Sequence, residues 1–232
     1  MEIMKKFIIF KQGVLEELPL QLGVFPFGII YGIMAIESGL TPIQAFLMSS
    51  IIFGGASQIA FVQLISTATP LGVVVTTVSA INSRHFLYSI SMMEYLKNLS
   101  LKWRIVLSYL LTDEAYAVSI RRFINEPSTS FLHFHLLGTG ITLFLSWQIS
   151  TLIGVLVGGD LPQFLDLQFI IPLTFIAIIV PMIKSISTFL VVIASAFSGL
   201  ILKSLDINFW IVISGMIGVV IGLTSSKLDK KR

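Results

Sequence analysis

Five polar side chains interrupt two hydrophobic stretches of this chain in a pattern that could bind ions or protons. The first stretch carries Asn82, Arg84 and His85, and the second carries Asp113 and Glu114. An ionised side chain at the centre of a membrane helix costs about 2.5 to 3.5 kcal/mol, whereas a Leu, Ile, Phe or Val contributes only about 0.3 to 0.6 kcal/mol. Neither stretch can therefore carry its ionised groups without a partner.

The spacing of these residues predicts that partner. If the chain turns at Leu99, Arg84 lies fifteen residues before the turn and Glu114 fifteen residues after it. At 1.5 Å per residue both lie about 20 Å from the turn, near the bilayer centre. We expect an ion pair between Arg84 and Asp113 or Glu114. Such a pair could lock two helices together, or it could leave one carboxyl free to carry a proton.

The residues around Arg84 also predict a polar helix face. Arg84 and Tyr88 are four residues apart and share this face, with Asn82 and His85 on the adjoining one. His85 could relay protons, because imidazole titrates near neutral pH, or it could be a fixed structural donor. The candidates for proton coupling are Asp113, Glu114 and His85.

A glycine pair stands in another apolar stretch, in the segment from Phe53 to Gln58. Glycine weakens a helix and lets a ligand approach the backbone, while a glutamine amide both donates and accepts hydrogen bonds. Tight helix packing explains the glycines equally well. Together with a first helix broken around Pro26, this segment could hold the charged ends of a zwitterion. The candidate substrate-binding residues are Pro26, Gly28, Gly54, Gly55, Ser57, Gln58, Asn82, Arg84 and Tyr88.

The composition places these residues in a membrane protein. Of the 232 residues, 55% are hydrophobic and 12% charged, and the mean hydropathy of +0.94 exceeds that of soluble domains. The absence of cysteine excludes disulfides and thiolate chemistry. Four of the fifteen Lys and Arg residues lie between Lys227 and Arg232, which indicates membrane topology rather than a nucleic-acid surface. We expect no nucleic-acid partner, no metal and no cofactor.

About eight stretches are long enough to cross a bilayer as helices. They are Leu18 to Ile36, Pro42 to Ser66, Leu71 to Met93, Ile105 to Ile120, Phe131 to Val157, Leu167 to Ile183, Ser185 to Leu202 and Ile207 to Leu223. We expect an all-α polytopic membrane protein with one transmembrane domain over residues 1–232. Within it, residues 1–17 could form an interfacial helix and residues 224–232 a cytoplasmic tail.

The distribution of charges and helix breakers adds detail to this fold. The positive-inside bias places both termini in the cytoplasm, although Lys97, Lys102 and Arg104 would then lie outside. Either the bias is overridden there, or the third or fourth segment does not cross fully. Proline and glycine predict breaks in some helices, including Pro172 and Pro181 in the sixth, and paired breaks are typical of inverted repeats.

Two further patterns favour ordinary structural roles. Glycines four residues apart at Gly28 and Gly32, at 154 and 158, and at 218 and 222 predict close packing between helices. His133 and His135 stand near a membrane end without an obvious acidic companion, so we interpret them as interfacial rather than metal-binding.

The chain carries a series of ordered motifs: Pro26-Phe27-Gly28, Gly32, Gly39-Leu40-Thr41-Pro42, Ser49, Phe53 to Gln58, Asn82 to Ser89, and Thr112-Asp113-Glu114. In their order and spacing, from about Gly13 to Arg122, they resemble the AzlC family. The resemblance implies the large subunit of a two-component exporter of branched-chain amino acids (valine, leucine, isoleucine). It also implies a small AzlD-like membrane subunit as partner and a location in the bacterial cytoplasmic (inner) membrane.

We therefore expect secondary active, proton-coupled export. The alternative is an ion or small-solute channel, in which the same polar residues would line a continuous pore. We do not expect an enzyme, because the sequence carries no second, separated intramembrane carboxylate and no Ser and His motif. No Gly-rich phosphate-binding loop after a strand is present either, so we do not expect ATP to drive transport.

Overall fold

The computed structural model describes residues 2–126, 130–158, 180, 183, 185–207 and 209–229, with the side chains of 227–229 left out. This part of the chain is helical and contains no strand, so the predicted all-α class is confirmed for it. Two compact units divide the chain. The first comprises residues 1–66 and 81–161, and the second comprises residues 67–80 and 162–232.

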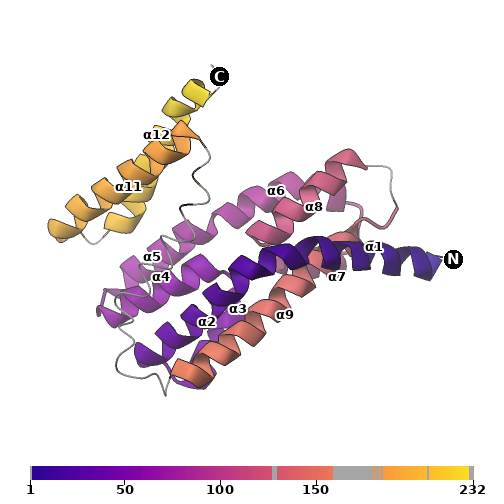
Figure 1. Cartoon of the computed structure of the whole chain (residues 1–232), viewed down its shortest axis with the longest axis horizontal. Coiled ribbons are helices and arrows are strands. Elements are labelled where there is room, and N and C mark those ends of the chain that lie inside the picture. The colour runs from indigo at the N-terminus through magenta and orange to yellow at the C-terminus, as the bar shows by residue number, and fades with distance from the viewer. Residues whose placement is uncertain are drawn as a thin grey trace. The chain divides into compact units, whose positions relative to one another are not determined.

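A long helix at the start of the chain supports the first unit. Helix α1 (Glu2–Glu17) continues through the 3-10 turn η1 (Leu18–Leu20) into α2 (Gln21–Glu37), and α9 (His133–Gly158) packs along both (Figure 1). At Gly13 and Gly154, a Cβ atom would collide with a backbone carbonyl of the opposite helix. The main chains of α1 and α2 therefore approach that of α9 closely, which confirms the predicted packing role of Gly28, Gly32 and the glycines at 154 and 158.

The predicted break at Pro26 is wrong, because α2 runs through this residue without interruption. Proline removes one N–H donor from a helix, and a helix in a protein can tolerate that loss when the rest of its ladder is intact. A change in the helical hydrogen-bond pattern, from α to 3-10, occurs instead at Pro19, near the start of η1. Pro172 and Pro181 lie outside the described residues.

Three helical stretches are interrupted near their middle instead. The first consists of α3 (Pro42–Ile52) and α4 (Gly55–Ser66), the second of α5 (Leu71–Asn82) and α6 (Arg84–Leu96), and the third of α7 (Leu101–Tyr109) and α8 (Asp113–Asn125). The interruptions fall at residues 53–54, 83 and 110–112. Each one coincides with a polar motif noted in the sequence.

Local chemistry explains the first interruption. Thr41 caps the start of α3 with a capping box, in which its side chain and that of Gln44 bind each other's backbone N–H. Phe53 ends this helix in a left-handed conformation, with φ of 34°, which L-residues seldom adopt. Helix α4 then starts at Gly55, and the Gln58 N–H donates to the Gly54 carbonyl over 3.0 Å.

Three continuous helices are long and apolar enough to cross a membrane: Glu2–Glu37, His133–Gly158 and Ile186–Ser204. Shorter apolar helices lie at Pro42–Ile52, Gly55–Ser66 and Trp210–Ser226. The predicted number of about eight spans is not confirmed by this set. The sixth predicted span, with its contribution to an inverted repeat, lies outside the described residues apart from Val180 and Ile183.

In the second unit, α11 (Ile186–Ser204) packs against α12 (Trp210–Asp229). The Ser187 hydroxyl donates to the Ser225 carbonyl over 2.7 Å. A Cβ on Gly218 would collide with the Ser195 hydroxyl, and one on Gly222 would lie 3.2 Å from Val191. The predicted packing role of the glycines at 218 and 222 is thus confirmed within this pair.

Candidate functional site

The three helix interruptions of the first unit lie together. A Cβ on Gly54 would lie 3.2 Å from Asn82 Oδ1, which places the first interruption beside the second. The Tyr109 hydroxyl donates to the Ser50 carbonyl, and the rings of Tyr109 and Phe53 are 5.9 Å apart, which places the third beside the first. We call the residues 53–58, 82–85 and 110–114 the break cluster.

An ion pair joins the second and third interruptions. Arg84 Nη1 lies 2.5 Å from Asp113 Oδ2, so the predicted pairing is confirmed with Asp113 as the acid. Both side chains are about one third exposed, at 34% and 33%. His85 Nε2 lies 3.8 Å from Asp113 Oδ1, within reach of the same carboxylate. Arg84 Nε is buried without a hydrogen-bond partner among the described residues, so one donor of the guanidinium is unused.

The polar face predicted on α6 contacts α8 beyond this ion pair. The rings of Tyr88 and Tyr116 stack with centroids 4.6 Å apart, and the Ser91 and Tyr116 hydroxyls lie 2.9 Å apart. Asn82 is only partly buried, and its Oδ1 atom has no hydrogen-bond partner in the described part of the chain. Asn82, Arg84, His85 and Tyr88 therefore lie together where α5 ends and α6 begins.

Glu114 has different surroundings from Asp113. It forms no ion pair with any described residue, although Arg84 is close enough to influence it. Its charge also acts on Glu17, at the end of α1. The two neighbouring acids of α8 thus have different interaction partners: Asp113 pairs with Arg84, whereas Glu114 acts on the carboxyl group of Glu17.

The glycine segment of the first interruption is held by its own side chains. The Ser57 hydroxyl donates to the Gly54 carbonyl over 2.7 Å, and Gln58 Oε1 accepts from the Gly54 N–H over 3.3 Å. Gln58 Oε1 also accepts from Trp147 Nε1 of α9 over 3.1 Å. These bonds satisfy polar groups that the interruption would otherwise leave open. The substrate-binding role of these residues stays a prediction.

Packing against Trp147 accounts for the glycines of this region. A Cβ on Gly55 would lie 2.7 Å from the Trp147 ring, and one on Gly28 would collide with Ser150 of α9. Trp147 is buried and also stacks with Tyr31 of α2 at a centroid distance of 6.2 Å. Sequence reasoning missed this tryptophan, although Ser146 and Gln148 beside it in the apolar helix are a polar signal that could have drawn attention to it. Pro26 and Gly28 both belong to α2, and their predicted role in binding substrate is not tested by these contacts.

A second polar group connects α1, α8 and α9. His135 is fully buried, and its Nε2 lies 3.1 Å from Glu16 Oε2. Arg122 bridges Glu16 Oε1 over 3.1 Å and Glu126 Oε2 over 3.3 Å. The interpretation of His135 as interfacial and without an acidic companion is therefore wrong. Its companion lies 119 residues away in the sequence, so no local pattern could identify it.

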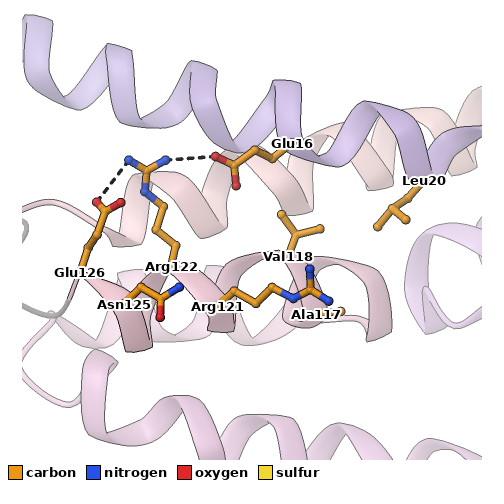
Figure 2. Close-up of a pocket in the computed structure, with 8 residues that line it drawn as sticks. All are labelled: Glu16, Leu20, Ala117, Val118, Arg121, Arg122, Asn125 and Glu126. Carbon is orange, nitrogen blue, oxygen red and sulfur yellow. Dashed lines mark hydrogen bonds and ion pairs between the residues drawn. The ribbon is translucent and has the colours of Figure 1, made fainter.

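A cavity of about 480 Å³ lies beside this group (Figure 2). The residues that line it come from the end of α1, from η1 and from α8, and they are Glu16, Leu20, Ala117, Val118, Arg121, Arg122, Asn125 and Glu126. Both signs of charge are present, which makes the cavity suitable for water or for a polar solute. None of these residues was predicted to belong to a site.

Sequence comparisons identify related proteins. A family model described as "AzlC protein" matches residues 19–161, which is more than half of the chain. An "Uncharacterized membrane protein" of Archaeoglobus fulgidus is 29% identical over 79% of this chain and 80% of its own length. The "Inner membrane protein YgaZ" of Escherichia coli is 26% identical over 66% of this chain and 63% of its own length. An "Uncharacterized membrane protein" of Helicobacter pylori is 28% identical over 65% and 64%, and no solved structure matches.

Proposed function

Because this chain is a membrane protein of the AzlC family, we propose that it is a secondary active exporter of branched-chain amino acids. Valine, leucine and isoleucine are the proposed substrates, and protons are the proposed coupling ions. A small AzlD-like membrane subunit is the proposed partner, and the bacterial cytoplasmic membrane is the proposed location. The polar groups then serve binding and coupling rather than catalysis.

One observation supports the proposal most strongly: three interrupted helices meet around the pair of Arg84 and Asp113. Helices α4, α6 and α8 begin at these interruptions, and the start of a helix favours a carboxylate. Helices α3, α5 and α7 end there, and the end of a helix favours an ammonium group. The break cluster thus offers complementary charge to both ends of an amino acid, as the interrupted helices of transporters do.

In the proposed cycle, Arg84 orients the carboxylate of the substrate. Its Nε–H is buried and has no partner among the described residues while Nη1 holds Asp113, so the guanidinium keeps a donor for a substrate carboxylate that enters when the site opens. Gly54, Ser57 and Gln58 lie beside Asn82 and would supply backbone and amide contacts. Glu114, which has no cationic partner in an ion pair among the described residues, carries the proton.

Counterflow in proteoliposomes tests this function. Vesicles that contain the chain together with a small AzlD-like subunit are loaded with unlabelled valine and diluted into labelled valine. We expect saturable uptake of label that leucine and isoleucine inhibit. Conductance in single-channel recordings without saturable counterflow would instead establish the channel alternative and refute the exporter.

Arg84→Gln provides the matched variant for this assay. A hydrogen bond to a charged group contributes about 1.5 to 3 kcal/mol, so we expect counterflow to fall roughly 10- to 100-fold. Lys97→Gln is the control, because it removes the same charge from an exposed residue at the end of α6. Equal counterflow in the two variants would remove Arg84 from the proposed site.

A further inference from the structure

Glu17 is a fully buried carboxyl group that the proposed cycle has not yet used. It is the last residue of α1 and has 0% exposure. Its Oε1 accepts from Gln21 Nε2 over 3.1 Å, and its Oε2 has no hydrogen-bond partner within the described part of the chain. A buried carboxylate is normally paired with a cation or held by several donors. Glu17 has one amide donor.

Among the described residues, no cation pairs with Glu17. On α8, the charge of Glu114 acts on Glu17 and repels it when it is ionised. Arg122 of the same helix is bound to Glu16 and Glu126, and His135 of α9 faces Glu16. At the start of α2, the neutral amide of Gln21 donates to the Glu17 carboxyl group.

These surroundings favour the neutral, protonated acid. Removing an ion from water is costly even after the protein relaxes, and no cation or second donor among the described residues offsets that cost at Glu17. Two carboxyls that interact strongly hold protons as a pair, so ionisation of one favours protonation of the other. The charge of Glu114 acts on Glu17, and that of Asp113 acts on Glu114, so these three acids of α1 and α8 belong to one electrostatic group.

A cavity of about 480 Å³ lies near the end of α1. Glu16, the neighbour of Glu17 in α1, and Leu20 of η1 both line it, whereas Glu17 itself does not. A proton that leaves Glu17 would therefore reach water in that cavity only after a rearrangement at the end of α1, leaving the carboxylate behind. The charged lining formed by Arg121, Arg122, Glu16 and Glu126 keeps such water in place (Figure 2).

We propose that Glu17 is a proton-binding residue of the transport cycle, and that it holds the coupling proton together with Glu114. This inference rests on the proposed export function. It also explains why α1 ends in an acid at a place that is closed to solvent. The coupling site then lies between α1 and α8, whereas the substrate carboxylate binds at Arg84.

The test uses Glu17→Gln, which mimics the protonated acid but cannot release a proton. In proteoliposomes with both subunits, we expect this variant to retain valine counterflow, since exchange requires no net proton movement. Accumulation of valine driven by a pH gradient is expected to fall at least tenfold, to the passive level. Glu94→Gln is the matched control, because Glu94 is an exposed acid of α6, and both activities should be unchanged.

The outcomes separate the two proposals. Absence of valine counterflow in the unmodified protein overturns the export function itself. Normal counterflow with full pH-driven accumulation in Glu17→Gln overturns only the role of Glu17. Accumulation in the unmodified protein that follows a Na⁺ gradient at equal pH also overturns it, because the bound ion would then not be a proton.

A second variant keeps the proposal testable if Glu17→Gln does not fold. If Glu17→Gln elutes as an aggregate, Glu17→Asp is measured instead, because it keeps a titratable group on a shorter side chain. We expect Glu17→Asp to accumulate valine with a changed pH dependence. A pH profile identical to that of the unmodified protein would overturn the proposal. So would loss of counterflow in a well-folded Glu17→Gln, since that variant resembles the protonated state.

Discussion

The pair of Arg84 and Asp113 allows a helix-locking role to be distinguished from a role in transport. The perturbation is a double-mutant cycle with Arg84→Gln, Asp113→Asn and the variant that carries both. Removing one member of a buried pair costs about 3 to 5 kcal/mol, whereas exposed pairs contribute about 0.2 to 1 kcal/mol. Each side chain is about one third exposed. We therefore expect a coupling free energy of about 2 kcal/mol, between these limits.

The cycle has two readouts. Chemical unfolding in mixed micelles gives the free energy of unfolding, and counterflow of labelled valine gives transport. Each single variant leaves an unpaired charge, so both should unfold more easily than the unmodified protein. The double variant should lose less unfolding free energy than the sum of the two single-variant losses. If the pair acts in transport, the stable double variant will still lack counterflow. If the pair only locks helices, the double variant will transport valine.

Two results would refute the reasoning. Additive unfolding free energies, with a coupling below about 0.5 kcal/mol, would show that the 2.5 Å contact contributes nothing to stability. Full counterflow in both single variants would show that neither charge is needed by the transporter. Lys97→Gln again serves as control for the loss of a cation, because Lys97 is exposed.

Two further predictions concern packing. Gly154→Ala should destabilise the protein by about 1 to 3 kcal/mol, because its Cβ would collide with the Ile29 carbonyl. Gly23→Ala should be neutral or slightly stabilising, because nothing lies within 4 Å of the added Cβ. Equal melting temperatures of the two variants would contradict this prediction. Trp147→Phe removes a hydrogen bond to Gln58 Oε1 and should lower the free energy of unfolding by about 1 to 3 kcal/mol. An unchanged melting temperature would argue that Gln58 does not stabilise the interruption between α3 and α4.

The sequence predicted those features that depend on local chemistry. The glycines at 54 and 55 predict a weakened helix, but not the full interruption that the structure has at residues 53–54. The register of two neighbouring segments predicts a pair of Arg84 with Asp113 or Glu114, and Asp113 is the partner. Glycines four residues apart indicate the close approach of α2 and α9. Each of these patterns involves few residues, and breaking it would be costly: an ionised side chain would stay unpaired, or a Cβ would collide with a neighbouring helix. The residue types alone therefore indicate such patterns.

Other features depend on contacts between distant parts of the chain. Glu17 appeared to belong to an interfacial helix, because charged and apolar residues alternate around it. Helix α1 instead packs against α9, where Gly13 meets the His135 backbone, and Glu17 one turn later is buried. Proline similarly predicted a break at Pro26, but the neighbouring turns of α2 are complete. Local propensity was outweighed by tertiary packing in both cases.

The unbroken run from α1 through α2 has a geometric consequence for the position of the N-terminus. Its 36 residues, at 1.5 Å per residue, amount to about 54 Å, while the hydrocarbon layer is about 30 Å thick. Roughly 20 Å of this rod must project into the headgroups and the water beyond, or the rod must tilt strongly. Lys5, Lys6 and Lys11 lie on its first three turns, where their charges suit the headgroup layer rather than the hydrocarbon. The rod is thus anchored at its outer end by charge and along its length by α9.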